Sequence, residues 1–349
     1  MKPSPAPSTA GAIAATTSAE KMVEGKDFAV VGTLPAEIDG DKTYWFGTDA
    51  QGTAYGEITV PDPTADPGSM ALDSFVQPVL LDTAGELTRM TPVRDSGTRT
   101  QMTGADADER WVTWLESASG QVGAGRWTLF SYERSTGALH ELGSWKDEVA
   151  GKDSGLDYEG RPEILGDEVV MTAWSMSHGR GTGTILTAPL DGSAPLTELV
   201  ADAKDPDVDA QGFSYVDGSG ALMYRETATG ASREVGPARA ACQFYRTETL
   251  LTCTETPSGM EVRIAQPSGR LRLGPFSHAS YPALRDGWAT FVEDADGEPT
   301  IHAVDLARST AYEVSSSQND WRLMGHGHAL VTQRGADDEP TAFQLIALR

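Results

Sequence analysis

FVEDADGEPTIHAVDL, residues 291–306, fits either a cation-binding loop or two strands joined by a hairpin, and the choice between them decides the fold. Its centre holds four carboxylates, those of Glu293, Asp294, Asp296 and Glu298. A calcium loop of the familiar kind continues its ligand spacing through about twelve residues. Here the alternation of apolar and polar residues resumes at once in TIHAVDL (300–306), and a period of two indicates a strand. The stretch therefore predicts two strands joined by a polar hairpin loop over residues 294–299.

The same pattern recurs through the rest of the chain. Five segments share a polar, acidic or glycine lead-in followed by apolar residues and Thr or Met: ERWVTWLES (109–117), DEVVMTAWS (167–175), TLLTCTE (249–255), DGWATFVED (286–294) and HALVTQRG (328–335). Each leads into a polar loop and a further strand, and QGFSYVDGSGALMYRETATGASREVG (211–236) fits more loosely. Repeats of roughly 40 residues with turn residues at their joints are typical of the four-stranded blades of a β-propeller.

The remaining strands complete a ring. An innermost strand is predicted just before each repeat, as in RPEIL (161–165), YPALRDG (281–287) and DWRLMG (320–325). DFAVVGTL (27–34) is a free strand that can pair with AFQLIALR (342–349), which completes the last blade and removes exposed strand edges. We predict an all-β propeller with seven four-stranded blades. Six or eight are the alternatives, because the first unit (43–90) and the fourth match the repeat poorly.

A family resemblance rests on the same stretch. FVEDADGEPTIHAVDLARSTAYEV (291–314) resembles a blade of the TolB-like, WD40-like propellers, which runs strand, polar loop with Asp-Gly, strand ending in Val-Asp-Leu, turn and strand. Phe291, Asp296, Gly297 and Val304 to Leu306 carry the match, and residues 114–142 are a weaker copy. The resemblance covers repeat units over roughly residues 100–349. It implies a propeller and no particular activity, because members range from envelope scaffolds to domains attached to peptidases.

Composition excludes some partners and suggests a compartment. Lys and Arg number 27 against 51 Asp and Glu, a net charge of −24, which argues against binding to nucleic acid or to an anionic membrane surface. No apolar stretch is long enough to span a bilayer. Residues 1–24 are rich in Pro, Ser, Thr and Ala and predict a flexible tether before a single propeller domain at 25–349. Such tethers often follow an export signal or lipid anchor, so we expect an exported or envelope-associated protein that is a monomer.

The two cysteines point to the same compartment. In ACQFYRTETLLTCT (241–254), Cys242 and Cys253 are equidistant from Thr247 and Glu248. If that pair is a two-residue hairpin turn, the cysteines face each other, and facing Cβ atoms are close enough for a disulfide with modest adjustment. The alternative is two separate buried thiols. We predict the disulfide.

Catalytic and metal-binding motifs are scarce. The chain has no Gly-x-Ser-x-Gly elbow, no His-Glu-x-x-His sequence and no zinc spacing of cysteines. DPDVDAQG (205–212) carries Asp205, Asp207 and Asp209 at alternate positions, a fragment of a Ca²⁺ loop without its later ligands, for which a solvated acidic loop is the alternative. We therefore expect no cofactor, with Ca²⁺ as the one candidate.

The ligand site is predicted on the loops that enter the innermost strands, because these converge on the mouth of the channel. They contribute Arg99, Arg161, His278, Tyr281, Asp320 and Trp321. Arginines and aromatic side chains on a concave surface suit a sugar or a peptide carboxylate, although these side chains can equally serve to cap and pack the loops.

The leading hypothesis is a non-catalytic binding or scaffolding module with a protein or glycan partner at the cell envelope. One alternative is a propeller glycoside hydrolase or lyase with Asp157 or Glu159 as acid or base and Arg161 holding the substrate. Another is a sensor domain of a larger membrane protein.

Overall fold

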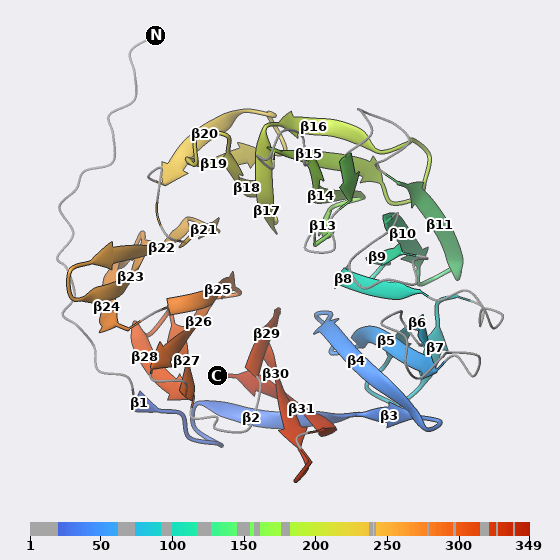
Figure 1. The fold of residues 1–349 in the computed structure, drawn as a ribbon, viewed down its shortest axis with the longest axis horizontal. Coiled ribbons are helices and arrows are strands. Elements are labelled where there is room, and N and C mark those ends of the chain that lie inside the picture. The colour runs from blue at the N-terminus through green and yellow to red at the C-terminus, as the bar shows by residue number, and fades with distance from the viewer. Residues whose placement is uncertain are drawn as a thin grey trace, which may run out of the picture.

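A computed structural model describes residues 20–61, 74–91, 100–117, 127–144, 154–156, 161–175, 182–236, 240, 242–277, 279–295, 298–314, 321–325, 327–337 and 339–349. Within these ranges every regular element is a β-strand. No helix that could cross a membrane occurs among them. Seven sheets stand around a central axis, so the predicted seven-bladed propeller is confirmed (Figure 1).

The first four blades follow one another from the innermost strand outward. Blade 1 consists of β4 (Asp41–Thr48), β5 (Ala54–Pro61), β6 (Ser74–Leu81) and β7 (Leu87–Arg89), with the short β3 (Glu37–Ile38) on the other edge of β4. Blade 2 consists of β8 (Gln101–Ala107), β9 (Trp111–Ser117), β10 (Trp127–Glu133) and β11 (Ala138–Gly143). In blade 3, both β12 (Ser154–Leu156) and β13 (Glu163–Leu165) pair with the inner edge of β14 (Glu168–Ser175), which is followed by β15 (Thr182–Pro189) and β16 (Thr197–Ala201). Blade 4 consists of β17 (Ala203–Asp209), β18 (Gly212–Asp217), β19 (Leu222–Glu226) and β20 (Ser232–Gly236).

The last three blades repeat the order. Blade 5 consists of β21 (Cys242–Arg246), β22 (Thr249–Thr256), β23 (Gly259–Gln266) and β24 (Gly269–Phe276). Blade 6 consists of β25 (Ala279–Arg285), β26 (Trp288–Ala295), β27 (Glu298–Asp305) and β28 (Thr310–Val314). Blade 7 consists of β29 (Trp321–Gly325), β30 (His328–Arg334), β31 (Pro340–Leu348) and, as its outermost strand, β2 (Phe28–Pro35). The 291–306 stretch is the β26–β27 hairpin, as predicted, although its strands reach closer to the turn, with Ala295 opposite Glu298.

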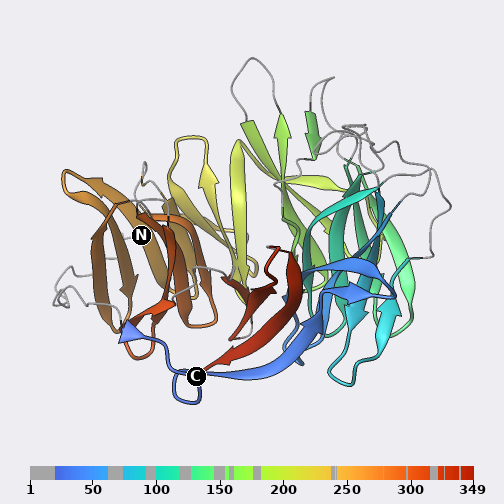
Figure 2. The same cartoon turned by 60° about the horizontal axis from the view of Figure 1, so that its bottom comes forward.

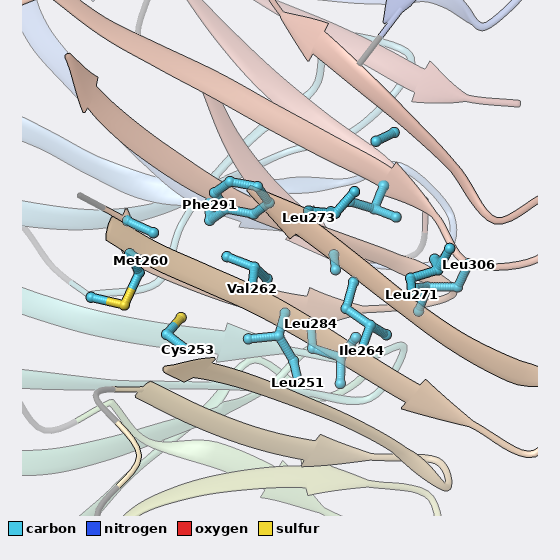
Figure 3. Close-up of a cluster of buried hydrophobic side chains, with 14 residues drawn as sticks. Leu251, Cys253, Met260, Val262, Ile264, Leu271, Leu273, Leu284, Phe291 and Leu306 are labelled. Carbon is cyan, nitrogen blue, oxygen red and sulfur yellow. The ribbon is translucent and has the colours of Figure 1, made fainter. Parts of the chain in front are cut away.

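The hydrophobic core is divided among the interfaces between blades. Among the described residues, seven clusters of buried side chains fill these interfaces, one cluster for each. Figure 3 shows the cluster between blades 5 and 6, where Leu251, Val262 and Ile264 meet Leu284 and Phe291. Every residue of β9 is buried, because a second strand has a neighbour on each side and a blade on each face. This explains the near-continuous apolar runs that mark the repeats.

The ring closes through the N-terminal strand, as predicted. β2 pairs antiparallel with β31, from Phe28 opposite Leu348 to Pro35 opposite Ala342 (Figure 2). Just before it, β1 (Glu20–Lys21), inside the segment predicted as a tether, pairs in parallel with β28 of blade 6. Met22 packs on the cluster between blades 6 and 7. The described N-terminal segment therefore touches the outer edges of two blades.

The predicted disulfide is present. Cys242 on β21 is bonded to Cys253 on β22, and the two residues are direct partners in the strand register. Thr247 and Glu248, at the turn, both have positive φ, of 47° and 62°, as a two-residue type I′ hairpin requires. The bridge ties the innermost strand of blade 5 to the second strand.

One element differs from the prediction. Residues 205–212 were expected to form a loop, but β17 extends through Asp209 as the innermost strand of blade 4. Ala203 and Val208 are buried against blade 3, and a register shift between Lys204 and Asp207 takes up the intervening residues. A bulge of this kind lets a strand continue through a proline, here Pro206.

Candidate functional site

A cavity of about 420 Å³ lies inside the ring. Its wall is built mainly from the innermost strands, which surround the axis in Figure 1, and from the turns that follow them, with Tyr55 added by the second strand β5. The charged and hydroxyl-bearing residues that line it are Thr48, Tyr55, Asp106, Asp108, Arg161, Glu163, Asp209, Arg246, Arg285 and Asp286. Several lie at the ends of their strands, since Asp106 is near the end of β8 and Arg246 and Arg285 end β21 and β25. Much of the cavity therefore lies beside the turns that lead to the second strands.

An ion-pair network crosses the channel beside this cavity. Arg285 of blade 6 binds Glu163 of blade 3, with Nη2 2.8 Å from Oε1, and Asp207 of blade 4, with Nη1 2.9 Å from Oδ1. Arg246 of blade 5 binds the same Asp207 oxygen at 2.8 Å. Blades 3 and 6 lie on opposite sides of the axis, as the positions of β13 and β25 show (Figure 1). The network therefore joins four blades across the interior of the ring.

The members of this network satisfy one another. Oε2 of Glu163 accepts a hydrogen bond of 2.7 Å from the backbone N–H of Val208. Burial alone would lower the pKa of Arg285, but the charges of Glu163 and Asp207 outweigh burial and raise it, so the guanidinium stays charged. For Asp207, burial raises the pKa and Arg285 opposes the rise. Because these groups are committed to each other, we regard the network as a tie between blades.

Three other groups facing the cavity have free bonding capacity. Asp106 accepts a hydrogen bond of 2.8 Å from the backbone N–H of Ile164 through Oδ2, and burial followed by the charge of Glu163 raises its pKa to about 6. The side chain of Tyr55 is 5% exposed, and its hydroxyl forms no hydrogen bond with any described residue. Arg161 is exposed to the cavity and has no ion-pair partner in the described part of the chain. These three residues form the candidate site.

Local structure explains their positions. Arg161 and Pro162 lie directly before β13, where the innermost strand of blade 3 is interrupted after β12, and Pro162 cannot donate a backbone hydrogen bond. Tyr55 lies over Gly47, because a Cβ built on Gly47 would come within 2.0 Å of the tyrosine oxygen. Only glycine at position 47 leaves room for this hydroxyl.

The structure accounts for some of the predicted site residues. Of these, Arg161 faces the cavity. Tyr281 and Trp321 lie on the innermost strands β25 and β29, and their side chains are not among those described. Residues Arg99, Asp157, Glu159, His278 and Asp320 lie outside the described residues.

The acidic run considered for Ca²⁺ has other partners. Asp207 binds Arg246 and Arg285, and Asp209 caps its own turn by accepting hydrogen bonds from the N–H groups of Gln211 and Gly212. The described residues contain no group of three or more side chains that could hold a metal ion.

Sequence reasoning missed Tyr55, Asp106 and the network. The available signal was charge inside short strands, as in GADADE (104–109), DVD (207–209) and LRD (284–286), at positions next to the turn before each repeat. A charged residue in a strand that is otherwise enclosed needs a partner, and the channel supplies it. The partners come from different blades, so no local pattern pairs them.

Comparison with known proteins shows the fold only. No family model and no curated protein matches the chain. A prolyl endopeptidase structure is similar over 85% of this chain and 49% of its own length, with 8% identity and a TM-score of 0.56. A structure of YCF48 bound to a D1 peptide is similar over 95% of this chain and 98% of its own, with 9% identity and a TM-score of 0.53. TolB from Acinetobacter baumannii is similar over 76% and 63%, with 13% identity and a TM-score of 0.44.

The chain thus spans about half of the peptidase and nearly all of YCF48. With its seven blades and its similarity to the YCF48 propeller, the protein has the β-propeller fold that its repeats predict.

Proposed function

We propose that this protein is a non-catalytic binding module that engages a peptide segment of a protein partner at its channel. The carrying observation is the division of charged groups inside the ring. Arg246, Arg285, Glu163 and Asp207 are tied to one another, whereas Arg161 and Asp106 face the cavity without ion-pair partners among the described residues. Free charged groups in a preformed cavity suit recognition of a partner's polar groups.

The comparison with YCF48 supports binding over catalysis. YCF48 is a peptide-bound propeller that this chain matches over almost the full length of both proteins. The prolyl endopeptidase, in contrast, is about twice as long as the part that this chain matches. Fold similarity at this level of identity transfers no activity, so peptide binding is our proposal for this chain.

We also propose that the protein works outside the cytoplasm, at the cell envelope. The Cys242–Cys253 disulfide supports this, because structural disulfides persist in oxidising compartments. Intact mass of protein alkylated without reduction, after purification from its natural host, would test the proposal. Alkylation of both thiols would contradict it.

The binding proposal can be tested with displayed random 12-residue peptides. We expect the protein to enrich one family of peptides and to bind a labelled member of it in fluorescence anisotropy. The mass of the peptide should stay unchanged after incubation, because the protein does not cleave it. Arg161→Ala should weaken binding about tenfold, in keeping with loss of a charge-assisted hydrogen bond. Arg270→Ala, which changes an exposed arginine of β24 with no described ion pair, should have no effect.

Equal binding by the two variants, or no enrichment, would contradict the proposal. Turnover of a glycan that depends on Asp157, Glu159 and Arg161 would instead establish the hydrolase or lyase alternative.

A further inference from the structure

Two opposite charges share the channel cavity without forming an ion pair. Asp106 comes from β8 of blade 2, and Arg161 precedes β13 of blade 3. Each faces the cavity, and no ion pair joins them, although Arg246 and Arg285 in the same wall are both paired with carboxylates. Charges that can meet in an enclosed space usually pair, so two that stay apart leave complementary positions for a ligand.

The hydroxyl of Tyr55 belongs to the same group. Tyr55 lines the same cavity as Asp106 and Arg161, and the charges of these two residues act in opposite directions on the pKa of its phenol, which burial already raises. The ring is buried, yet the hydroxyl has no hydrogen-bond partner among the described residues. The hydroxyl group therefore stands at the cavity as a donor that a ligand can use.

We propose that this cavity binds a small zwitterion, namely a free α-amino acid or a dipeptide. Asp106 accepts hydrogen bonds from the ligand's ammonium group, and Arg161 donates to its carboxylate, with the Tyr55 hydroxyl as a further donor. The tied pairs around Arg285 form the fixed wall of the site. A volume of about 420 Å³ lies within the range typical of small-molecule pockets, roughly 300–1,000 Å³, and accommodates ligands of this size.

This inference goes beyond the proposed function, because it concerns free small molecules and stands or falls without a protein partner. It is tested by thermal shift and then calorimetry with the twenty amino acids and the dipeptides Gly-Gly and Ala-Ala. We expect at least one of them to raise the melting temperature. Its N-acetyl form lacks the ammonium group and its amide lacks the carboxylate, so each should bind at least about tenfold more weakly.

Three variants assign the contacts. Tyr55→Phe removes a hydroxyl that has no described partner, so it should leave the melting temperature unchanged and weaken binding by about three- to tenfold. Arg161→Gln should weaken binding of the free ligand at least about tenfold and should barely change binding of its amide, which has no carboxylate. Asp106→Asn should weaken binding of the free ligand by a similar factor and should barely change binding of the N-acetyl form, which has no ammonium group. Arg270→Gln is the matched control and should bind like the unmodified protein.

The proposal is overturned if no amino acid or dipeptide in the panel binds. It is also overturned if a blocked form binds as tightly as its zwitterion, which would make the cavity a site for a single charge, or if Arg270→Gln weakens binding as much as Arg161→Gln does.

Discussion

Glu57 shows how one buried carboxyl can set the pH dependence of this fold. It lies on β5 and faces blade 2, where Glu116 of β9 approaches it. Its Oε2 atom is enclosed and has no hydrogen-bond partner among the described residues. Burial, and then the charge of Glu116, raises the pKa of Glu57 to about 8. The folded protein therefore holds a proton at neutral pH that the unfolded chain has released.

The sign of the effect follows by linkage. With a folded pKa of about 8 and an ordinary value of 4.5, the contribution of Glu57 to the free energy of unfolding is largest below pH 4.5 and is lost as pH rises through 8. Glu57→Gln should flatten this fall and stabilise the protein at pH 8.5 by about 1–3 kcal/mol. Urea unfolding at pH 5.5, 7 and 8.5 measures it, with the exposed Glu109→Gln as control. Parallel pH profiles for all three proteins would contradict the assignment.

Arg285 is the residue on which the channel network depends. Arg285→Met leaves Glu163 without its ion-pair partner and Asp207 with Arg246 alone. Removing one partner of a buried ion pair costs about 3–5 kcal/mol, so we expect a loss of that order in denaturant unfolding. Adding Glu163→Gln to the variant should recover part of it. A loss no larger than that of the exposed control Arg270→Met would show that the network contributes little.

At this scale the sequence predicted little of the candidate site. Arg161 was identified because it lies in a segment expected to enter an innermost strand. Tyr55 was not, since it belongs to the irregular first unit and reaches the channel only because Gly47 leaves it space. Asp106 looked like one acid among many, and only the approach of blade 3 encloses it.

Elements were far more predictable than the site. Trp111, Val169, Leu250, Trp288 and Leu330 all lie in second strands, where burial on both faces requires apolar residues. The innermost strands were harder to predict because they are short, bulged and charged at the channel. This is why β17 was expected as a loop.

The closing strand β2 offers a matched pair of substitutions. Leu34 is 7% exposed and packs in the cluster between blades 7 and 1, whereas Val31 is 53% exposed and lies at the register shift between Val30 and Gly32. Leu34→Ala should cost about 2–5 kcal/mol, and Val31→Ala no more than about 0.5 kcal/mol. Chemical denaturation measures both. Limited proteolysis should cut the Leu34→Ala protein faster near β2, and equal effects would mean that β2 adds little to closure.

The whole molecule is a ring of seven blades with similar interfaces. In blade 7 the neighbouring strands β31 and β2 come from opposite ends of the chain, so only hydrogen bonds and packing join them. At that join the backbone N–H of Arg349 donates a 3.0 Å hydrogen bond to the carbonyl of Asp27. The end of β31 and the start of β2 therefore lie side by side, as the two strands of a hairpin do at their turn, although no turn joins them here.

A circular permutant tests this view of the ring. It would begin at Asp41 and carry residues 27–40 after Arg349, joined through Asn-Gly, the dipeptide favoured in two-residue hairpins. Because β31 and β2 then form a continuous hairpin, we expect a folded monomer that melts within a few degrees of the original. Light scattering and thermal unfolding measure this, and an aggregated product would contradict the arrangement.

The pairing of Phe28 with Leu348 also gives the ring a mechanical weak point. A force that pulls residues 27 and 349 apart acts at one end of the β2–β31 pair, across the strands. It therefore breaks their hydrogen bonds one after another (unzipping geometry) instead of loading all of them together (shear geometry). Under tension between its two ends, the ring would open at blade 7 while the blades between them, each a continuous meander, remain intact.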